Sequence, residues 1–208
     1  MPAAFITLEG PEGAGKTLQA ERLAEALRAR GQRVRLTREP GGTRLGEEIR
    51  SIVLARAMDG AAGIDARADA LLFNAARAQL VAEVIQPALA AGETVVCARF
   101  ADSTLAYQGY AAGLPIEELR AIAAVATAGL APDLTILLDV PPEVGLARKA
   151  DEARNRFEAA FDLEFHQRVR AGFLELARQE PARWRVIDAA RDADAVFGDV
   201  LEVALGAL

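Results

Sequence analysis

Residues 10–17 have the types and the spacing of a phosphate-binding loop. They read Gly-Pro-Glu-Gly-Ala-Gly-Lys-Thr and match the pattern G-x-x-x-x-G-K-[ST] at every fixed position. Glycines let backbone N–H groups converge on a polyphosphate, and the start of a helix adds partial positive charge. In such a loop Lys16 reaches the β- and γ-phosphates, and the Thr17 hydroxyl ligates Mg²⁺. The pattern predicts a nucleoside triphosphate site that is formed by Gly10, Gly13, Ala14, Gly15, Lys16 and Thr17.

The loop requires a strand before it and a helix after it, and both are predicted. Residues 4–8 form a continuous apolar run, and residues 16–30 carry apolar side chains at helical spacing. Similar strands are expected at 34–37, 94–97, 134–138 and 185–187, and helices at 44–56, 66–91 (interrupted or ended near Pro87), 115–130, from about 142, 157–179 and 192–205. This alternation implies parallel βαβ units, and continuously apolar strands imply a sheet covered on both faces. The predicted class is α/β, a single doubly wound domain with a five-stranded parallel sheet flanked by helices.

Composition excludes several classes of protein. The chain has 208 residues, 52% of them hydrophobic, which fits one folded domain better than two cores or a disordered chain. Its single cysteine excludes a disulfide framework and a cysteine-based zinc site. No apolar stretch approaches the roughly 20 residues of a membrane helix, and no export signal is visible, so a cytoplasmic protein is expected. The net charge of −6 argues against nonspecific binding of nucleic acid.

Among proteins with this loop, a small-molecule kinase is favoured over GTPases and motor ATPases. The chain lacks an Asn-Lys-x-Asp segment with which a GTPase reads its base, and it lacks an apolar strand that ends in adjacent acids. Glu12 lies inside the loop, where an acid repels phosphate. It is therefore expected to face a second substrate, with a solvated loop position as the alternative. Residues 148–158 are polar and charged, and we expect them to form a short mobile lid on a P-loop kinase fold.

Several segments together resemble bacterial thymidylate kinases. Residues 37–43 read Thr-Arg-Glu-Pro-Gly-Gly-Thr, residues 72–77 read Leu-Phe-Asn-Ala-Ala-Arg, and residues 99–109 read Arg-Phe-Ala-Asp-Ser-Thr-Leu-Ala-Tyr-Gln-Gly. Shorter matches at 132–134, 138–140 and 156–158 follow in the order of the family, so the resemblance spans most of the chain. It implies a kinase that phosphorylates dTMP to dTDP, with ATP and Mg²⁺ as cofactors. It also implies a homodimer packed through long helices, which the alanine-rich residues 66–91 would permit.

The resemblance assigns the acceptor nucleoside to side chains from these segments. Phe73 would stack on thymine, and Arg77, one helical turn away, would hydrogen-bond the base edge. Tyr107 would crowd the 2′ position of the sugar and so favour deoxyribose, and Glu12 would accept from the 3′-hydroxyl. The pocket would be lined by a loop that contains Thr104, Tyr107 and Gln108.

Arginines would serve both phosphates. Arg38 and Arg99 each follow a predicted strand and resemble the family's arginines for the acceptor phosphate, whose oxygens suit a fork of donors. The lid contains Arg148, Lys149, Arg154 and Arg156. In the family subtype whose phosphate loop lacks an arginine, a basic lid residue stabilises the transferring phosphoryl group, and Arg154 is the expected one. Arg148 is expected to contact nucleotide, and Glu158 to help hold the lid or a metal-bound water. The expected catalytic residues are Lys16, Arg99 and Arg154.

One position departs from the family. The strand at 94–97 is expected to be followed by an Asp-Arg pair whose aspartate acts on Mg²⁺ through its outer shell and orients the phosphates, but the sequence reads Ala98-Arg99. Asp102 and Asp139 are the acids that could compensate. Ala98 also motivates an alternative, a catalytically silent nucleotide-binding protein. A kinase for another nucleotide or a deoxynucleoside is the third possibility.

Three further positions carry weaker expectations. The Glu39-Pro40 pair is similar to the family's turn, where a cis peptide is expected. His166 lies on a polar stretch of a predicted helix and is expected at the surface or against the lid. Cys97 is expected to be a small buried residue of its strand.

Overall fold

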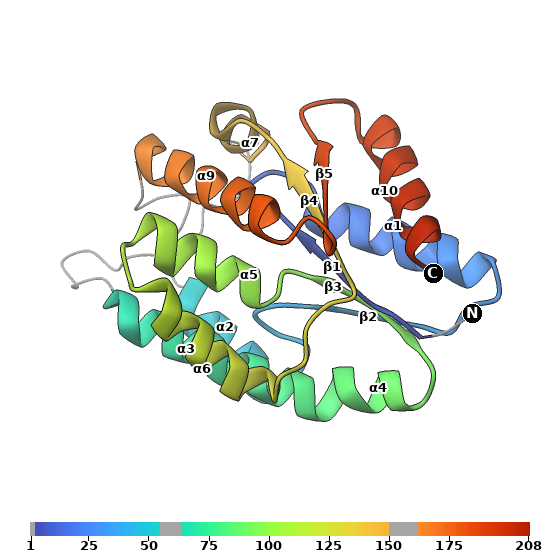
Figure 1. Ribbon diagram of the computed structural model, residues 1–208, viewed down its shortest axis with the longest axis horizontal. Coiled ribbons are helices and arrows are strands. Elements are labelled where there is room, and N and C mark those ends of the chain that lie inside the picture. Colours follow the sequence, from blue (N-terminus) through green and yellow to red (C-terminus); the bar gives the residue numbers. More distant parts are fainter. Residues whose placement is uncertain (1–2, 55–63, 150–161) are drawn as a thin grey trace.

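The computed structural model describes residues 3–54, 64–149 and 162–208, and these contain one sheet of five parallel strands (Figure 1). The strand order is β2-β3-β1-β4-β5. The first strand, β1, is therefore the central one, with β3 and β2 on one side of it and β4 and β5 on the other. The predicted α/β class with a five-stranded parallel sheet is confirmed. The strands are β1 (Phe5–Glu9), β2 (Val34–Arg38), β3 (Thr94–Ala98), β4 (Leu134–Asp139) and β5 (Trp184–Asp188).

Helices cover both faces of the sheet. Ile6 and Leu8 of β1 pack with α1 (Lys16–Ala29) and α10 (Ala193–Ala207) on one face. Phe5, from the same strand, packs on the opposite face with Leu80 of α3 (Ala66–Leu80), and α9 (Leu163–Gln179) covers β4 and β5 there. Successive side chains point to opposite faces, and both faces are buried, so the strands read as continuous apolar runs. Around these lie α2 (Arg44–Leu54), α6 (Ile116–Thr127) and α7 (Pro142–Arg148).

The helix expected over 66–91 is divided into three parts. After α3 the chain forms a π-helical segment, η1 (Val81–Ile85), and then α4 (Gln86–Ala90), with Pro87 in its first turn. Proline has no N–H to donate, and its ring clashes with the carbonyl of the residue four positions earlier. A wider π turn immediately before Pro87 removes that conflict, so the helical direction continues instead of ending.

The prediction of a loop around residues 104–108 is wrong. The structure instead has a short helix, α5 (Ala101–Thr104), which continues as the π-helical segment η2 (Leu105–Ala111). Every residue from Leu105 to Gly109 is buried. A helix that is buried on all sides has no polar face, so it leaves no amphipathic period in the sequence. Among the described helices, none is long and apolar enough to cross a membrane.

Candidate active site

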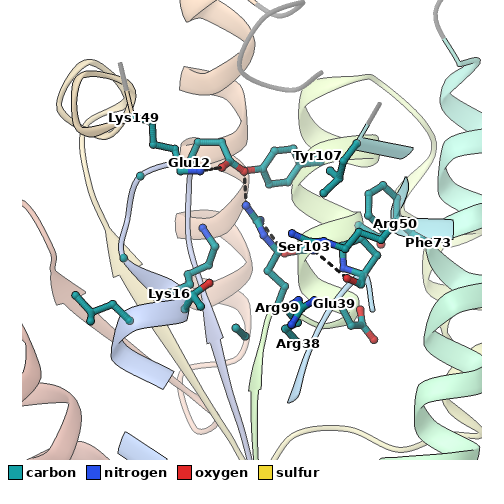
Figure 2. A pocket seen from close by; sticks show the side chains of 18 of the residues that line it. Glu12, Lys16, Arg38, Glu39, Arg50, Phe73, Arg99, Ser103, Tyr107 and Lys149 are labelled. Atoms are coloured by element: carbon teal, nitrogen blue, oxygen red, sulfur yellow. Dashed lines mark hydrogen bonds and ion pairs between the residues drawn. The ribbon is translucent and has the colours of Figure 1, made fainter. Parts of the chain in front are cut away.

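A cavity of about 450 Å³ opens at the carboxyl ends of β1, β2 and β3 (Figure 2). The phosphate-binding loop forms one side of it, through Gly13, Gly15, Lys16 and Thr17. The opposite side carries Arg38, Phe73 and Gln108, which come from β2, α3 and η2. The structure therefore brings most of the predicted site residues, from distant segments of the chain, into one pocket.

The phosphate-binding loop has the backbone that its sequence requires. Gly13 and Gly15 have φ angles of 70° and 86°, in the left-handed region that glycine adopts without strain. Gly15 precedes α1, whose N-terminus receives no side-chain cap and has no acid in its first turn. The first N–H groups of a helix have no partner within the helix, so this end can bind an anion.

A pair of glycines joins the loop to α7. A Cβ atom on Gly13 would lie 1.9 Å from the Gly145 carbonyl oxygen, and one on Gly145 would lie 2.1 Å from the Glu12 carbonyl oxygen. Neither position has room for any side chain. The loop and α7 therefore pack backbone against backbone.

Lys16 bends back over its own loop. Its Nζ donates hydrogen bonds to the carbonyl oxygens of Gly10, at 2.8 Å, and Pro11, at 2.6 Å. Burial, followed by the nearby charge of Arg99, lowers the pKa of the Lys16 ammonium to about 7. Because this pKa lies near neutrality, the charge of the buried Lys16 side chain depends on the anions that bind close to it.

Glu12 turns its carboxylate toward Arg99 and Tyr107 (Figure 2). Its Oε1 accepts hydrogen bonds from Arg99 Nη2 and, at 3.0 Å, from the Tyr107 hydroxyl, while Lys149 Nζ lies 4.0 Å from Oε2. Burial alone would favour the neutral acid, but the charges of Arg99, Lys16 and Lys149 outweigh it and lower the pKa of Glu12 to about 2. Glu12 is therefore an anion on the side of the cavity away from the loop amides.

Arg99 holds a backbone conformation that few non-glycine residues adopt. Its φ is 72°, in the left-handed region. Its guanidinium lies over the Tyr107 ring, with Cζ 5.2 Å from the ring centroid. The strain of such a residue is sustained by surrounding contacts. Here the Leu8 carbonyl accepts from the Arg99 N–H at 3.0 Å, and the Cys97 thiol donates to the Arg99 carbonyl at 3.0 Å. The turn after β3 thereby aims the guanidinium into the cavity.

Glu9 accepts two hydrogen bonds from residues that follow β3. Its Oε1 accepts from the Phe100 N–H at 2.7 Å, and its Oε2 accepts from the Ser103 hydroxyl at 2.6 Å. Glu9 is fully buried, and burial, with the nearby Asp102 carboxylate, raises its pKa to about 7. Sequence reasoning missed this residue. The available signal was an acid at the end of an otherwise apolar strand.

Basic side chains gather on the β2 side of the cavity. Arg38 Nη2 donates to both carboxylate oxygens of Glu47, at 3.1 and 3.2 Å, and Arg50 Nη1 donates to the Pro40 carbonyl at 2.9 Å. Burial, and then the charge of Arg38, lower the pKa of Arg50. An anion between the two guanidiniums would relieve that repulsion. Sequence reasoning missed Arg50, which resembles any helical surface arginine until α2 is placed against the cavity.

Arg77 lies behind the cavity wall. Its guanidinium donates to Glu39 Oε2 at 3.0 and 2.7 Å, to Asn74 Oδ1 at 2.8 Å, and to the Phe100 carbonyl and Thr104 Oγ1, each at 3.1 Å. The side chain is 1% exposed. Phe73 and Thr104 line the cavity, whereas Arg77 fixes the wall that carries them. A contact from Arg77 to a base stays a prediction. The Glu39-Pro40 peptide bond is cis, as expected.

The acids that could compensate for Ala98 are already engaged. Asp102 accepts from Arg183 at 2.7 and 3.1 Å, and Asp139 accepts from Arg170 at 2.7 and 2.8 Å. Ala98 itself lies at the end of β3 and lines the cavity. Each of these two carboxylates would have to give up its arginine to take over this position.

The lid is described only at its first residues. Arg148 Nη1 and Nη2 donate to the carbonyls of Ala189 and Ala190, at 2.8 and 3.0 Å, so its guanidinium bridges α7 and the segment after β5. Lys149 lines the cavity. Arg154, Arg156 and Glu158, with most of the predicted lid, lie outside the described residues. His166 is 1% exposed, which corrects its expected surface position, because α9 presents this side chain inward next to Phe165.

The residues present fit a nucleotide-bound Mg²⁺ ion better than a resident metal. The described residues contain no group of three or more histidine, cysteine, aspartate or glutamate side chains that could hold a metal. Mg²⁺ that arrives with phosphates needs few protein ligands, since phosphate oxygens and waters complete its octahedron. Thr17 supplies one hydroxyl on the cavity wall, at the second residue of α1.

Comparisons with known proteins agree on one family. The family model for thymidylate kinase matches residues 8–200. The chain is 54% identical to the thymidylate kinase of Deinococcus radiodurans over 197 residues, which is 94% of this chain and 93% of that protein. It is also 54% identical to that of Solidesulfovibrio magneticus over 200 residues, 92% of this chain and 94% of the relative. The crystal structure of thymidylate kinase from Ehrlichia chaffeensis superposes with a TM-score of 0.78 at 34% identity, over 98% of this chain and 99% of that one.

Proposed function

The chain belongs to the thymidylate kinase family, and from this premise we propose that it transfers the γ-phosphoryl group of ATP to dTMP, forming dTDP and ADP. One observation carries the proposal. A single cavity holds the phosphate-binding loop on one side and the guanidiniums of Arg38 and Arg50 on the other, with the Arg99 guanidinium between them against Glu12. Two phosphate-bearing substrates can therefore meet with their phosphates between the two sides.

This reaction demands positioning and charge neutralisation more than proton transfer. The attacking atom is an oxygen of the acceptor phosphate, whose second pKa is about 6, so it is largely ionised at neutral pH. No general base has to be supplied. The side chains must instead hold two anions in line and exclude water, which is the chief contribution of a kinase site.

The donor side is built around the helix α1. The loop amides and Lys16 hold the β- and γ-phosphates of ATP, and the Thr17 hydroxyl holds Mg²⁺. Mg²⁺ held there would supply positive charge that neutralises the charge developing on the phosphates. Arg154 supplies further charge on the transferring group. Arg148 contributes to the donor site through the backbone of the segment after β5, to which it donates.

The acceptor side separates phosphate, sugar and base. Arg38, Arg50 and Arg99 hold the dTMP phosphate as forks of donors. Tyr107 and Glu12, which are hydrogen-bonded to each other at 3.0 Å, face the sugar, where the phenol crowds a 2′-hydroxyl and the carboxylate accepts from the 3′-hydroxyl. Phe73 stacks on the base.

A coupled assay of ADP release against a panel of nucleoside monophosphates tests the proposal. Release with dTMP, and little with dCMP, dAMP or dGMP, is the expected result. Release only with another acceptor would assign a different kinase activity. ATP binding without acceptor-dependent turnover would assign a catalytically silent protein.

ATP binding is expected to weaken as the pH rises from 7 to 9. The pKa of Lys16 is about 7 in the protein alone, and a bound triphosphate raises it by favouring the ammonium form. Binding above pH 7 therefore takes up a proton, and affinity falls by up to about tenfold per pH unit. The Kd of Mg·ATP, measured by calorimetry at pH 7, 8 and 9, checks this. A Lys16→Arg variant keeps its charge and should give a flat profile; a flat wild-type profile would refute the explanation.

The active unit is a homodimer that packs through α3 and α6. Leu71 on α3 is 55% exposed and Val125 on α6 is 84% exposed, and the two helices lie against each other. Ala75 and Ala78 continue the exposed apolar stripe of α3. An apolar face of this kind supports association with a second copy. Light scattering should give about twice the chain mass of 22.1 kDa, and Leu71→Arg should give the monomer. A monomeric wild type would overturn this part of the proposal.

A further inference from the structure

A buried carboxylate accepts a hydrogen bond from an amide on the cavity wall. Gln108 of η2 lines the same cavity as Phe73, and its Nε2 donates to Asp69 Oδ2 on α3 at 2.9 Å. Both residues are almost fully buried, with Asp69 4% and Gln108 4% exposed. The pair therefore makes its contact within the wall, away from bulk water.

The chemistry of the pair fixes which way the amide points. An ionised carboxylate can only accept hydrogen bonds, whereas a glutamine amide has a donating nitrogen and an accepting oxygen. Against the carboxylate form of Asp69, the reversed amide would place Gln108 Oε1 beside Asp69 Oδ2, two acceptors with no proton between them, in a buried site where such a mismatch is costly. Asp69 therefore keeps Nε2 toward itself and Oε1 turned away from it. Among the described residues, Oε1 receives no hydrogen bond.

We propose that Asp69 sets the base selectivity of the acceptor site by fixing Gln108 as a hydrogen-bond acceptor. This inference rests on the proposed function, because it requires that the cavity holds the base of a nucleoside monophosphate. Thymine and uracil carry a hydrogen at N3 and can donate to Oε1. Cytosine has an unprotonated N3, which meets Oε1 as a second acceptor. Asp69 acts through Gln108 and is a positioning residue.

Phe73 and Arg77 differ from Gln108 in what they present to the cavity. Phe73 offers a ring face, which every base can stack on. Arg77 is committed to Glu39, Asn74, Thr104 and the Phe100 carbonyl. The oriented amide of Gln108 is therefore a polar group on the cavity wall that can distinguish a protonated from an unprotonated N3, beside the Thr104 hydroxyl, which accepts from Arg77.

The selectivity for dTMP over dCMP should fall by at least about tenfold in Asp69→Asn, because the asparagine amide can accept from or donate to Gln108 in either orientation. The measured quantity is the ratio of kcat/KM for dTMP to that for dCMP. Asp69→Ala, which removes the carboxylate without adding bulk, should show the same fall and serves if Asp69→Asn does not fold. Asp69→Glu retains an acceptor and should keep the ratio within about threefold of the wild type.

A third acceptor, dUMP, separates selectivity from damage. Uracil has the same N3 hydrogen as thymine and lacks only the methyl group, so the ratio for dTMP over dUMP should stay unchanged in Asp69→Asn and Asp69→Ala. Equal falls in both ratios, or no fall in the dTMP to dCMP ratio in a folded variant, would overturn the inference. A wild type that uses dTMP and dCMP equally would overturn it too. Failure of the proposed function is distinct, since the wild type would then give no turnover with dTMP.

Discussion

Arg99→Ala is expected to lower kcat/KM for dTMP by about 10²- to 10³-fold, the usual effect of removing one preorganised charge that stabilises a transition state. The guanidinium lies between the anion Glu12 and the ring of Tyr107, on the acceptor side of the cavity. Its loss removes a fork of donors from the acceptor phosphate and also takes the nearest cation from Glu12. Steady-state kinetics with varied dTMP would measure the effect.

Backbone strain must be separated from the loss of the guanidinium. Alanine at position 99 keeps the cost of a left-handed φ, whereas Arg99→Gly removes that cost and lacks the same guanidinium. Both variants should lose activity to a similar degree. Arg44→Ala, at a side chain that is 95% exposed, serves as the control for a lost surface charge and should be unaffected. An Arg99→Ala enzyme within about threefold of the wild type would remove this residue from the mechanism.

Ala98→Asp is expected to raise the turnover number by about tenfold or more, since one well-placed electrostatic group is worth roughly 2.7–4 kcal/mol. Ala98 lines the cavity at the end of β3, beside Leu8 of β1 and Arg38 of β2 in the strand register. The new carboxylate would lie in a cavity that also holds cations, which compensates its burial. Asp102 and Asp139 are each ion-paired with an arginine and do not supply the charge that is missing at position 98.

The matched control for this gain is Ala98→Asn, which has nearly the same shape without the charge. If the charge acts on Mg²⁺ through its water shell, only the aspartate should raise turnover, and the gain should require Mg²⁺. ADP release at saturating ATP and dTMP provides the measurement. An unchanged or lower rate in Ala98→Asp would show that this site does not need the missing carboxylate.

The sheet could be predicted from sequence because each strand is buried on both faces. The apolar runs at 4–8, 94–97 and 134–138 lie within one residue of β1, β3 and β4. The last residue of each of these strands, Glu9, Ala98 and Asp139, was missed, and of the three Ala98 lines the cavity. Burial also explains why η2 was not predicted as a helix. A helix without a polar face shows no alternation of apolar and polar residues at helical spacing.

Much of the candidate site could be located from the sequence, but the contacts between its side chains could not be predicted. The spacing of the phosphate-binding loop assigned Lys16 to the site, and the family resemblance assigned Arg38 and Tyr107, and the structure gathers all three around one cavity. Pairing across distant segments, such as Arg77 with Glu39 or Gln108 with Asp69, depends on how α3 and η2 pack. A local pattern carries no information about that packing.

The contact between the phosphate-binding loop and α7 also limits how this protein can be redesigned. Gly13 and Gly145 each leave no room for a Cβ atom, and each is blocked by backbone that belongs to the other's segment. No second substitution can make room for the first, because backbone cannot be trimmed as a side chain can. A mutant library aimed at new phosphate acceptors therefore has to hold both positions constant, and its diversity belongs on the opposite wall of the cavity.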